Sequence, residues 1–239
     1  MLVGTAVALS GVARAEIEGE IHVGYASIYE FRGVNFGDHL AEGGADVSME
    51  ANGFGLSAGV WYGDVSDGGT NELDLYAAVS RDFALGKYTT TVELGYTHFT
   101  FPDAATGNPI KEPYLGISAE VIEGLSAGFT AYWATSNNFF ADGSDLNGWW
   151  FDLSASYSRE MAPGVSPEAT VGITYSAGYN PADNDGLGFD GFDHVYATLG
   201  VPVMLTETAS LNPFVKGVLN VSGDDRDFLI GGISLNVTW

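Results

Sequence analysis

The sequence contains no cysteine and few basic residues, and each shortage excludes a class of protein. Without cysteine the chain can form neither disulfide cross-links nor cysteine-based zinc or redox sites. Its 8 lysines and arginines stand against 31 aspartates and glutamates, which gives a net charge of −23. We therefore expect no nucleic acid partner, because binding a phosphate backbone requires a basic surface.

Long apolar runs are also missing. No segment beyond the N-terminus has 18 consecutive apolar residues, so the sequence predicts no membrane-spanning helix. However, 46% of the residues are hydrophobic, too many for an acidic disordered chain. The 33 glycines and 26 tyrosines and phenylalanines (12 and 14) favour a β-barrel over a helical enzyme.

The first fifteen residues predict an export signal. Residues 1–12 are uncharged and mostly apolar or small, and Ala13-Arg14-Ala15 resembles an A-x-A cleavage site. A retained N-terminal helix is the alternative. We expect residues 1–15 to be a signal peptide and residues 16–239 to form the mature domain.

Beyond residue 15 the dominant period is two, which predicts half-apolar β-strands. At the C-terminus, for example, Ile233, Leu235 and Val237 alternate with Ser234, Asn236 and Thr238. Twelve such stretches are predicted, and bacterial single-chain barrels have even strand numbers. The predicted spans are 17–28, 44–51, 53–62, 72–83, 87–99, 112–121, 125–135, 148–159, 167–177, 193–203, 208–220 and 227–239.

Three features favour a membrane barrel over a soluble β-sandwich, which would also alternate. Short turns after the second, fourth and sixth predicted strands contrast with longer loops rich in Asp, Gly and Asn after most of the others, as in outer-membrane barrels. Aromatic residues on the apolar face fall near predicted strand ends, where two girdles would contact lipid headgroups. The predicted girdle residues are Tyr25, Tyr62, Tyr88, Tyr96, Trp133, Trp149, Tyr157, Tyr175 and Trp239.

The third feature is the last residue. Trp239, preceded by alternating apolar residues, resembles the C-terminal signal read by the outer-membrane insertion machinery. The predicted fold is an all-β, antiparallel, up-and-down transmembrane barrel of about twelve strands. The predicted location is the bacterial outer membrane, with lipid and lipopolysaccharide as surroundings.

The N-terminal third also resembles a known family. Tyr29-Glu30-Phe31-Arg32-Gly33-Val34 is followed by Gly43-Gly44-Ala45-Asp46-Val47, then by Gly59-Val60-Trp61 and Glu72-Leu73-Asp74-Leu75-Tyr76. This order, within residues 21–76, resembles the TorF-type family of outer-membrane porins of Gram-negative bacteria. The resemblance implies an outer-membrane barrel that serves as a channel, without a defined substrate.

If the apolar face meets lipid, the opposite face lines the lumen. Acidic residues dominate that face, and acidic rings favour cations over anions. We therefore expect a narrow pore for passive diffusion of small, preferentially cationic solutes. A plugged lumen is the alternative, because twelve strands lie between filled and open barrels. The predicted pore-lining residues are Glu18, Glu20, His22, Asp46, Glu50, Trp61, Asp74, Tyr76, Glu93, Asp152 and Lys216.

Arg32 is a candidate constriction residue because cations are so rare in this chain. It is predicted to lie in an external loop of about fifteen residues between the first two strands. One interpretation folds this loop inward, with Arg32 facing the acidic wall. The other leaves it in an exposed, salt-bridged loop.

Catalytic and metal motifs are not recognisable. The histidines His22, His39, His98 and His194 lack H-x-x-x-H or H-E-x-x-H spacing, and no serine has a nucleophile-elbow setting. The acidic stretch 183–190 departs from the calcium-loop pattern at Leu187. We expect no cofactor, no metal and no enzyme. The alternatives to a channel are a closed structural or surface-interaction barrel with acidic external loops and, on the strength of His98 and His194, an outer-membrane hydrolase.

Overall fold

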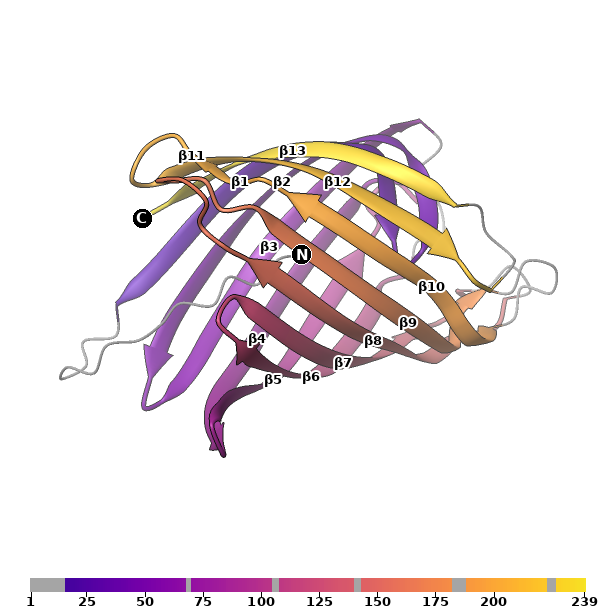
Figure 1. Ribbon diagram of the computed structural model, residues 1–239. Coiled ribbons are helices and arrows are strands. Elements are labelled where there is room, and N and C mark those ends of the chain that lie inside the picture. Colours follow the sequence, from indigo (N-terminus) through magenta and orange to yellow (C-terminus); the bar gives the residue numbers. More distant parts are fainter. Residues whose placement is uncertain (1–15, 68–69, 105–107, 140–142, 182–187, 223–226) are drawn as a thin grey trace.

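The computed structural model describes residues 16–67, 70–104, 108–139, 143–181, 188–222 and 227–239, which form antiparallel strands around one barrel (Figure 1). The predicted signal peptide, residues 1–15, and most of the acidic stretch 183–190 lie outside the described residues. The strands are β1 (Ile17–Phe31), β2 (Val34–Ala51), β3 (Phe54–Asp67), β4 (Glu72–Leu85), β5 (Tyr88–Thr100), β6 (Ile110–Ile122), β7 (Leu125–Ser136), β8 (Leu146–Ser158), β9 (Glu168–Pro181), β10 (Gly188–Gly200), β11 (Val203–Met204), β12 (Ala209–Asn220) and β13 (Phe228–Thr238).

Each long strand pairs with its sequence neighbours, and two further pairings close the ring. β1 pairs with β13, and β10 pairs with β12. β11 has two residues, and the only strand with which it pairs is β12, so the ring itself has twelve strands. The predicted twelve-stranded antiparallel barrel is confirmed. Closure satisfies the edge hydrogen bonds that an open sheet would leave unpaired in lipid.

The outer surface of the barrel is apolar. Alternate residues of every long strand point outward, and large aliphatic side chains among them are exposed, such as Val23 on β1, Leu94 on β5 and Leu235 on β13. A soluble protein rarely exposes an apolar surface that runs all the way round. All nine predicted girdle residues are exposed aromatics; Trp133 and Trp149 stack on neighbouring strands, with ring centroids 6.1 Å apart.

The two ends of the barrel differ. We call the end that carries residue 17 and the C-terminus the termini end. There the strands turn through Asn52-Gly53, Gly86-Lys87 and Glu123-Gly124, as predicted. Asn52 and Gly53 both have positive φ, 54° and 76°, as a two-residue type I′ turn requires. At the opposite loop end most connections are longer. The described residues contain no helix long and apolar enough to cross a membrane.

One predicted loop is wrong. Residues 29–43 are not an external loop, because β1 continues to Phe31 and β2 begins at Val34, joined by the tight turn Arg32-Gly33. The ladder is irregular here: its register shifts between Tyr29 and Glu30, and His39 has a φ of 62°. These irregularities break the period-two pattern, which therefore failed to reveal the strands. The strands β9 and β10 likewise extend farther into the predicted loop 177–192.

Candidate functional site

The strand register places every predicted pore-lining residue on the inner face of the barrel. Cross-strand partners share a face, so the pairs Glu20–Asp46, Trp61–Asp74 and Thr130–Asp152 identify inward positions on six strands. Glu18, His22, Glu50 and Tyr76 follow by alternation along the same strands. Glu93 on β5 pairs with the inward Ser80 of β4, and Lys216 on β12 pairs with the inward Ile230 of β13. The inner wall therefore carries Glu18, Glu20, His22, Asp46, Glu50, Trp61, Asp74, Tyr76, Glu93, Asp152 and Lys216.

The inner wall changes character along the barrel axis. Near the termini end, inward side chains such as Glu18, Glu50, Asp82 and Glu120 are exposed. In the loop half, every one of the twelve long strands contributes at least one buried inward residue. One from each strand is Ala26, Leu40, Val65, Asp74, Phe99, Glu112, Ala134, Trp150, Thr174, His194, Val218 and Ile230. The lumen is thus accessible from the termini end and filled in the loop half.

The filling is built around the turn between β1 and β2, whose residues 29–33 we call the hairpin tip. Arg32 reaches across the barrel to Glu112 on β6, with Nη2 2.5 Å from Oε1. The backbone carbonyl of Arg32 accepts a hydrogen bond of 3.0 Å from Asn180 on β9. Because β1 borders β2 and β13, these contacts join opposite walls. The hairpin tip therefore spans the lumen.

Aromatic rings enclose the Arg32 guanidinium. Its central carbon lies 4.2 Å from the ring centroid of Tyr132, 4.4 Å from that of Tyr179 and 5.5 Å from that of Trp150. Such cation–π contacts strengthen when water is excluded. Arginine stays protonated in proteins, and the Glu112 carboxylate lies within ion-pair distance. Arg32 is therefore a permanent cation inside the barrel.

Further bonds fix the hairpin tip on both sides of Arg32. Glu30 forms an ion pair with Lys216 on β12 and accepts a hydrogen bond of 2.7 Å from the backbone N–H of Gly33. Tyr29 donates a hydrogen bond of 2.8 Å to Glu72 on β4. Gly33 has a φ of +82°, and a Cβ there would meet the side chains of His194 and Asp193. Glycine is thus required twice, for its backbone angle and for the close approach to β10.

Apolar packing completes the filled half. One buried cluster contains Phe99, Trp150 and Tyr179, and a second contains Tyr29 and Leu40. Phe31, in the hairpin tip, packs against both clusters; its ring centroid lies 5.5 Å from that of Phe99. The hairpin tip is therefore held by ionic, hydrogen-bonding and apolar contacts together.

In the accessible half, tyrosines lie flat against the wall. Tyr76, Tyr114 and Tyr196 each lie across a glycine of the neighbouring strand, respectively Gly59, Gly95 and Gly172, where a Cβ would overlap the ring. Their hydroxyls donate to Asp46, Glu93 and Asp152, at 2.6, 2.9 and 3.0 Å. The glycines therefore leave room for the tyrosine rings to lie along the wall. The tyrosine hydroxyls in turn orient the carboxylates.

Two histidines that suggested hydrolysis lie in different settings. His98 is on the outer face of β5 and its Nδ1 is 3.5 Å from the hydroxyl of Tyr96. His194 is buried, and its Nδ1 contacts Asp193 at 2.8 Å and Thr174 at 3.1 Å. The hydroxyl of Ser176 donates to the carbonyl of Phe189. The structure does not bring the two histidines together.

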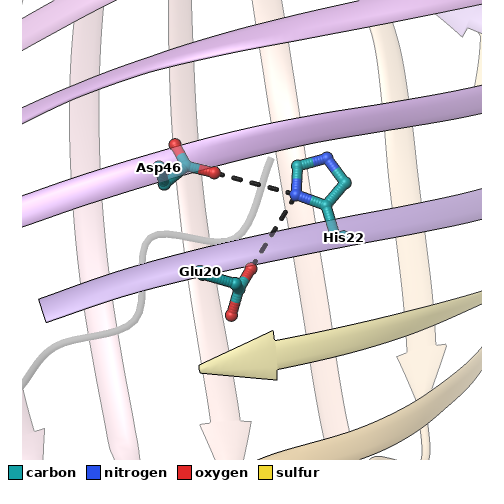
Figure 2. Close-up of side chains that lie close together, drawn as sticks. All are labelled: Glu20, His22 and Asp46. Carbon is teal, nitrogen blue, oxygen red and sulfur yellow. Dashed lines mark ion pairs between the residues drawn. The ribbon is translucent and has the colours of Figure 1, made fainter. Parts of the chain in front are cut away.

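Sequence reasoning missed several residues of this site. Glu112 was within a predicted strand but was not selected, and Tyr179 lies beyond the predicted end of its strand at residue 177. Both meet at Arg32, since the Tyr179 hydroxyl donates to Glu112 Oε2 at 2.7 Å. The rare inward cation was the available signal, but its partner is 80 residues away along the chain. Figure 2 shows that Glu20, His22 and Asp46 also come together. Nothing in the sequence indicated this cluster.

The closed barrel with an apolar exterior and a charged interior defines the chain as an outer-membrane β-barrel, in agreement with the predicted location. Solved structures with this fold include the NanC porin (14% identity, TM-score 0.59, covering 92% of this chain and 98% of that one) and the KdgM porin (14%, 0.54, 92% and 99%). An outer membrane channel from Pseudomonas putida F1 is also similar (11%, 0.57, 96% and 97%). At these identities the likeness concerns the fold.

The family follows from the sequence. The chain belongs to the Gcw_chp family, described as a bacterial protein of unknown function, whose profile matches residues 13–174. No curated protein sequence matches the chain significantly.

Proposed function

We propose that the protein is a non-enzymatic outer-membrane channel for small solutes, with a preference for cations and with the hairpin tip as its constriction. The observation that carries the proposal is the acidic inner wall, accessible from the termini end as far as the hairpin tip. Exposed carboxylates at this mouth, such as Glu18, Glu50 and Glu120, attract cations and repel anions. The likeness to two porins and a channel supports a channel, as does the resemblance to the TorF-type porins.

The hairpin tip is the proposed constriction, because its contacts with β6 and β9 span the lumen. Arg32 places a fixed positive charge opposite Glu112, which produces a field across the lumen. A solute would pass only when the hairpin tip moves aside, or when a gap opens between the hairpin tip and the inner wall. Bacterial barrels have short turns on the periplasmic side and longer loops on the outside. Because most long connections of this chain lie at the loop end, we infer that this end faces the outside of the cell.

A non-enzymatic role is supported by the two histidines. His194 is buried and committed to Asp193 and Thr174, and His98 faces outward, where lipid or headgroups would surround it. A general base must reach the proton that it removes. In neither setting could the imidazole reach a proton of a bound substrate.

A closed structural barrel is the second candidate, and the buried band in the loop half favours it. In that case the acidic external loops would contact partners or lipopolysaccharide. In both cases the C-terminal strand ending at Trp239 would be recognised by the insertion machinery during assembly.

Single-channel recording of the refolded protein in a planar bilayer with a salt gradient separates the two candidates. A steady current with a cation-favouring reversal potential is the expected result. If the wild type is silent and a variant without the Arg32–Glu112 pair conducts, the barrel is a closed channel that must be opened. Silence of both proteins would overturn the channel in favour of the structural barrel.

A further inference from the structure

Three potential metal ligands come together on the accessible part of the inner wall. Glu20 and His22 are alternate residues of β1, and Asp46 is the β2 residue opposite Glu20. Figure 2 shows the two carboxylates converging on His22 Nδ1, which is 3.9 Å from Glu20 Oε1 and 3.7 Å from Asp46 Oδ2. These three ligand atoms lie within 4.8 Å of one another.

The distances suit an ion better than a direct contact. Hydrogen bonds between nitrogen and a carboxylate oxygen are about 2.7–3.2 Å long, so neither carboxylate is hydrogen-bonded to His22 in this arrangement. A metal ion with bonds of about 2.0–2.2 Å holds its ligands roughly 3–4 Å apart. Small movements of the two carboxylates, which are 35% and 37% exposed, would bring all three atoms to an ion.

The ligands are oriented by neighbouring side chains, as metal ligands are in built sites. Tyr76 donates to Asp46 Oδ1 at 2.6 Å, which leaves Oδ2 directed towards His22. Asn236 donates to Glu20 Oε1 at 2.9 Å. The side-chain oxygen of Asn236 accepts from Asn212 at 2.8 Å, so its amide NH₂ group is directed to Glu20.

The imidazole is also fixed in place. A Cβ at Gly44, on β2, would lie 2.7 Å from His22 Nε2. The ring therefore lies close over this glycine, with Nδ1 on the side of the carboxylates. Its side chain is 16% exposed, and Nδ1 is the ring nitrogen nearest to the carboxylates of Glu20 and Asp46.

We propose that Glu20, His22 and Asp46 form a binding site for a divalent transition-metal ion on the inner wall of the barrel. The set of one imidazole and two carboxylates suits Zn²⁺ and its first-row neighbours, whereas Ca²⁺ and Mg²⁺ prefer oxygen ligands alone. Water would complete the coordination, because the site faces the accessible half of the lumen. The proposal does not depend on transport, since a closed barrel would bind the ion equally.

Calorimetric titration of the refolded full chain with Zn²⁺ in detergent tests the site. We expect one Zn²⁺ per chain, a loss of at least tenfold in affinity in His22→Ala and in Asp46→Asn, and little competition from excess Ca²⁺. Glu93→Gln is the matched control, because Glu93 also accepts a tyrosine hydrogen bond, from Tyr114, but is in no such ligand group among the described residues. This variant should bind Zn²⁺ as the wild type does.

A spectroscopic measurement separates coordination from attraction to a strongly acidic wall. With Cu²⁺ as the probe, electron paramagnetic resonance should show coupling to one imidazole nitrogen that disappears in His22→Ala. Absence of this coupling, or Zn²⁺ binding that is equally weakened by Glu93→Gln, would overturn the site. Normal heat-modifiable migration of each variant establishes that the barrel has folded.

Discussion

Arg32 and Glu112 form an ion pair inside the barrel, between the β1–β2 turn and the opposite wall, with both side chains less than 10% exposed. Buried pairs of this kind are costly to break singly, because the remaining charge has no partner. We expect Arg32→Met to lower the free energy of unfolding by about 3–5 kcal/mol and to raise the single-channel conductance. Denaturant titration in lipid vesicles and bilayer recording measure the two effects.

The double variant Arg32→Met/Glu112→Gln serves as the control, since it removes both charges. It should lose less stability than Arg32→Met alone while still conducting more than the wild type. Glu112→Gln completes the cycle, and a loss in the double variant equal to the sum of the two single losses would show that the pair makes no coupled contribution.

Gly33→Ala should displace the hairpin tip. Its Cβ would meet His194 and Asp193, and alanine disfavours a φ of +82°. Gly53→Ala, in the turn Asn52-Gly53 at the termini end, has a similar φ of +76° with no atom within 4 Å of its Cβ. We expect backbone strain to cost each variant about 1–2 kcal/mol, but only Gly33→Ala to alter conductance. Identical recordings for both would remove the constriction role of the hairpin tip.

The charge at the accessible mouth should set the ion preference. Replacing Glu18 and Glu50 together by glutamine removes two exposed inward carboxylates, so the reversal potential in a salt gradient should move towards zero. Glu123→Gln removes one carboxylate from a turn at the same end, outside the inner wall, and should leave the potential unchanged. A shift of equal size in both proteins would mean that net charge, and not the inner wall, decides the preference.

The outer surface should respond to charge according to depth. Leu94, at the middle of β5, is exposed on the outer face, as is Leu85 at the end of β4. We expect Leu94→Arg to lower the stability in lipid by about 2–4 kcal/mol and Leu85→Arg by about 0–1 kcal/mol. Reversible unfolding from vesicles provides the comparison. Similar costs at both positions would contradict the assignment of β5 to the membrane interior.

Trp239 tests the contribution of the terminal side chain to assembly. Its backbone exchanges two hydrogen bonds with Gly19, of 3.0 and 3.1 Å, and Trp239→Ala retains both. We expect the variant to refold normally in detergent and to assemble more slowly in the outer membrane of cells. Unchanged assembly in cells would exclude recognition of the ring by the insertion machinery.

The sequence predicted the ring of strands well because inward and outward residues differ in polarity along most of the chain. The C-terminal strand and the strands around Val92 and Leu153 alternate regularly and were found within a few residues of their ends. The region 34–43 was missed, since Gly37, His39 and a register shift interrupt the alternation. The partner of Arg32 could not be predicted, because Arg32 and Glu112 come together only in the closed ring. The approach of His22 to Asp46 depends instead on the register between β1 and β2, which the interrupted alternation concealed.

The tight turn at Arg32-Gly33 determines how the lumen could open. A long loop can swing freely and admit solutes to a continuously variable degree. Here the obstacle is the paired end of two wall strands, so β1 and β2 must bend together and release the contacts with β4, β6, β9, β10 and β12 as a set. Movement of that kind is cooperative, and its electrical signature would be a switch between two discrete levels of current with few intermediate states.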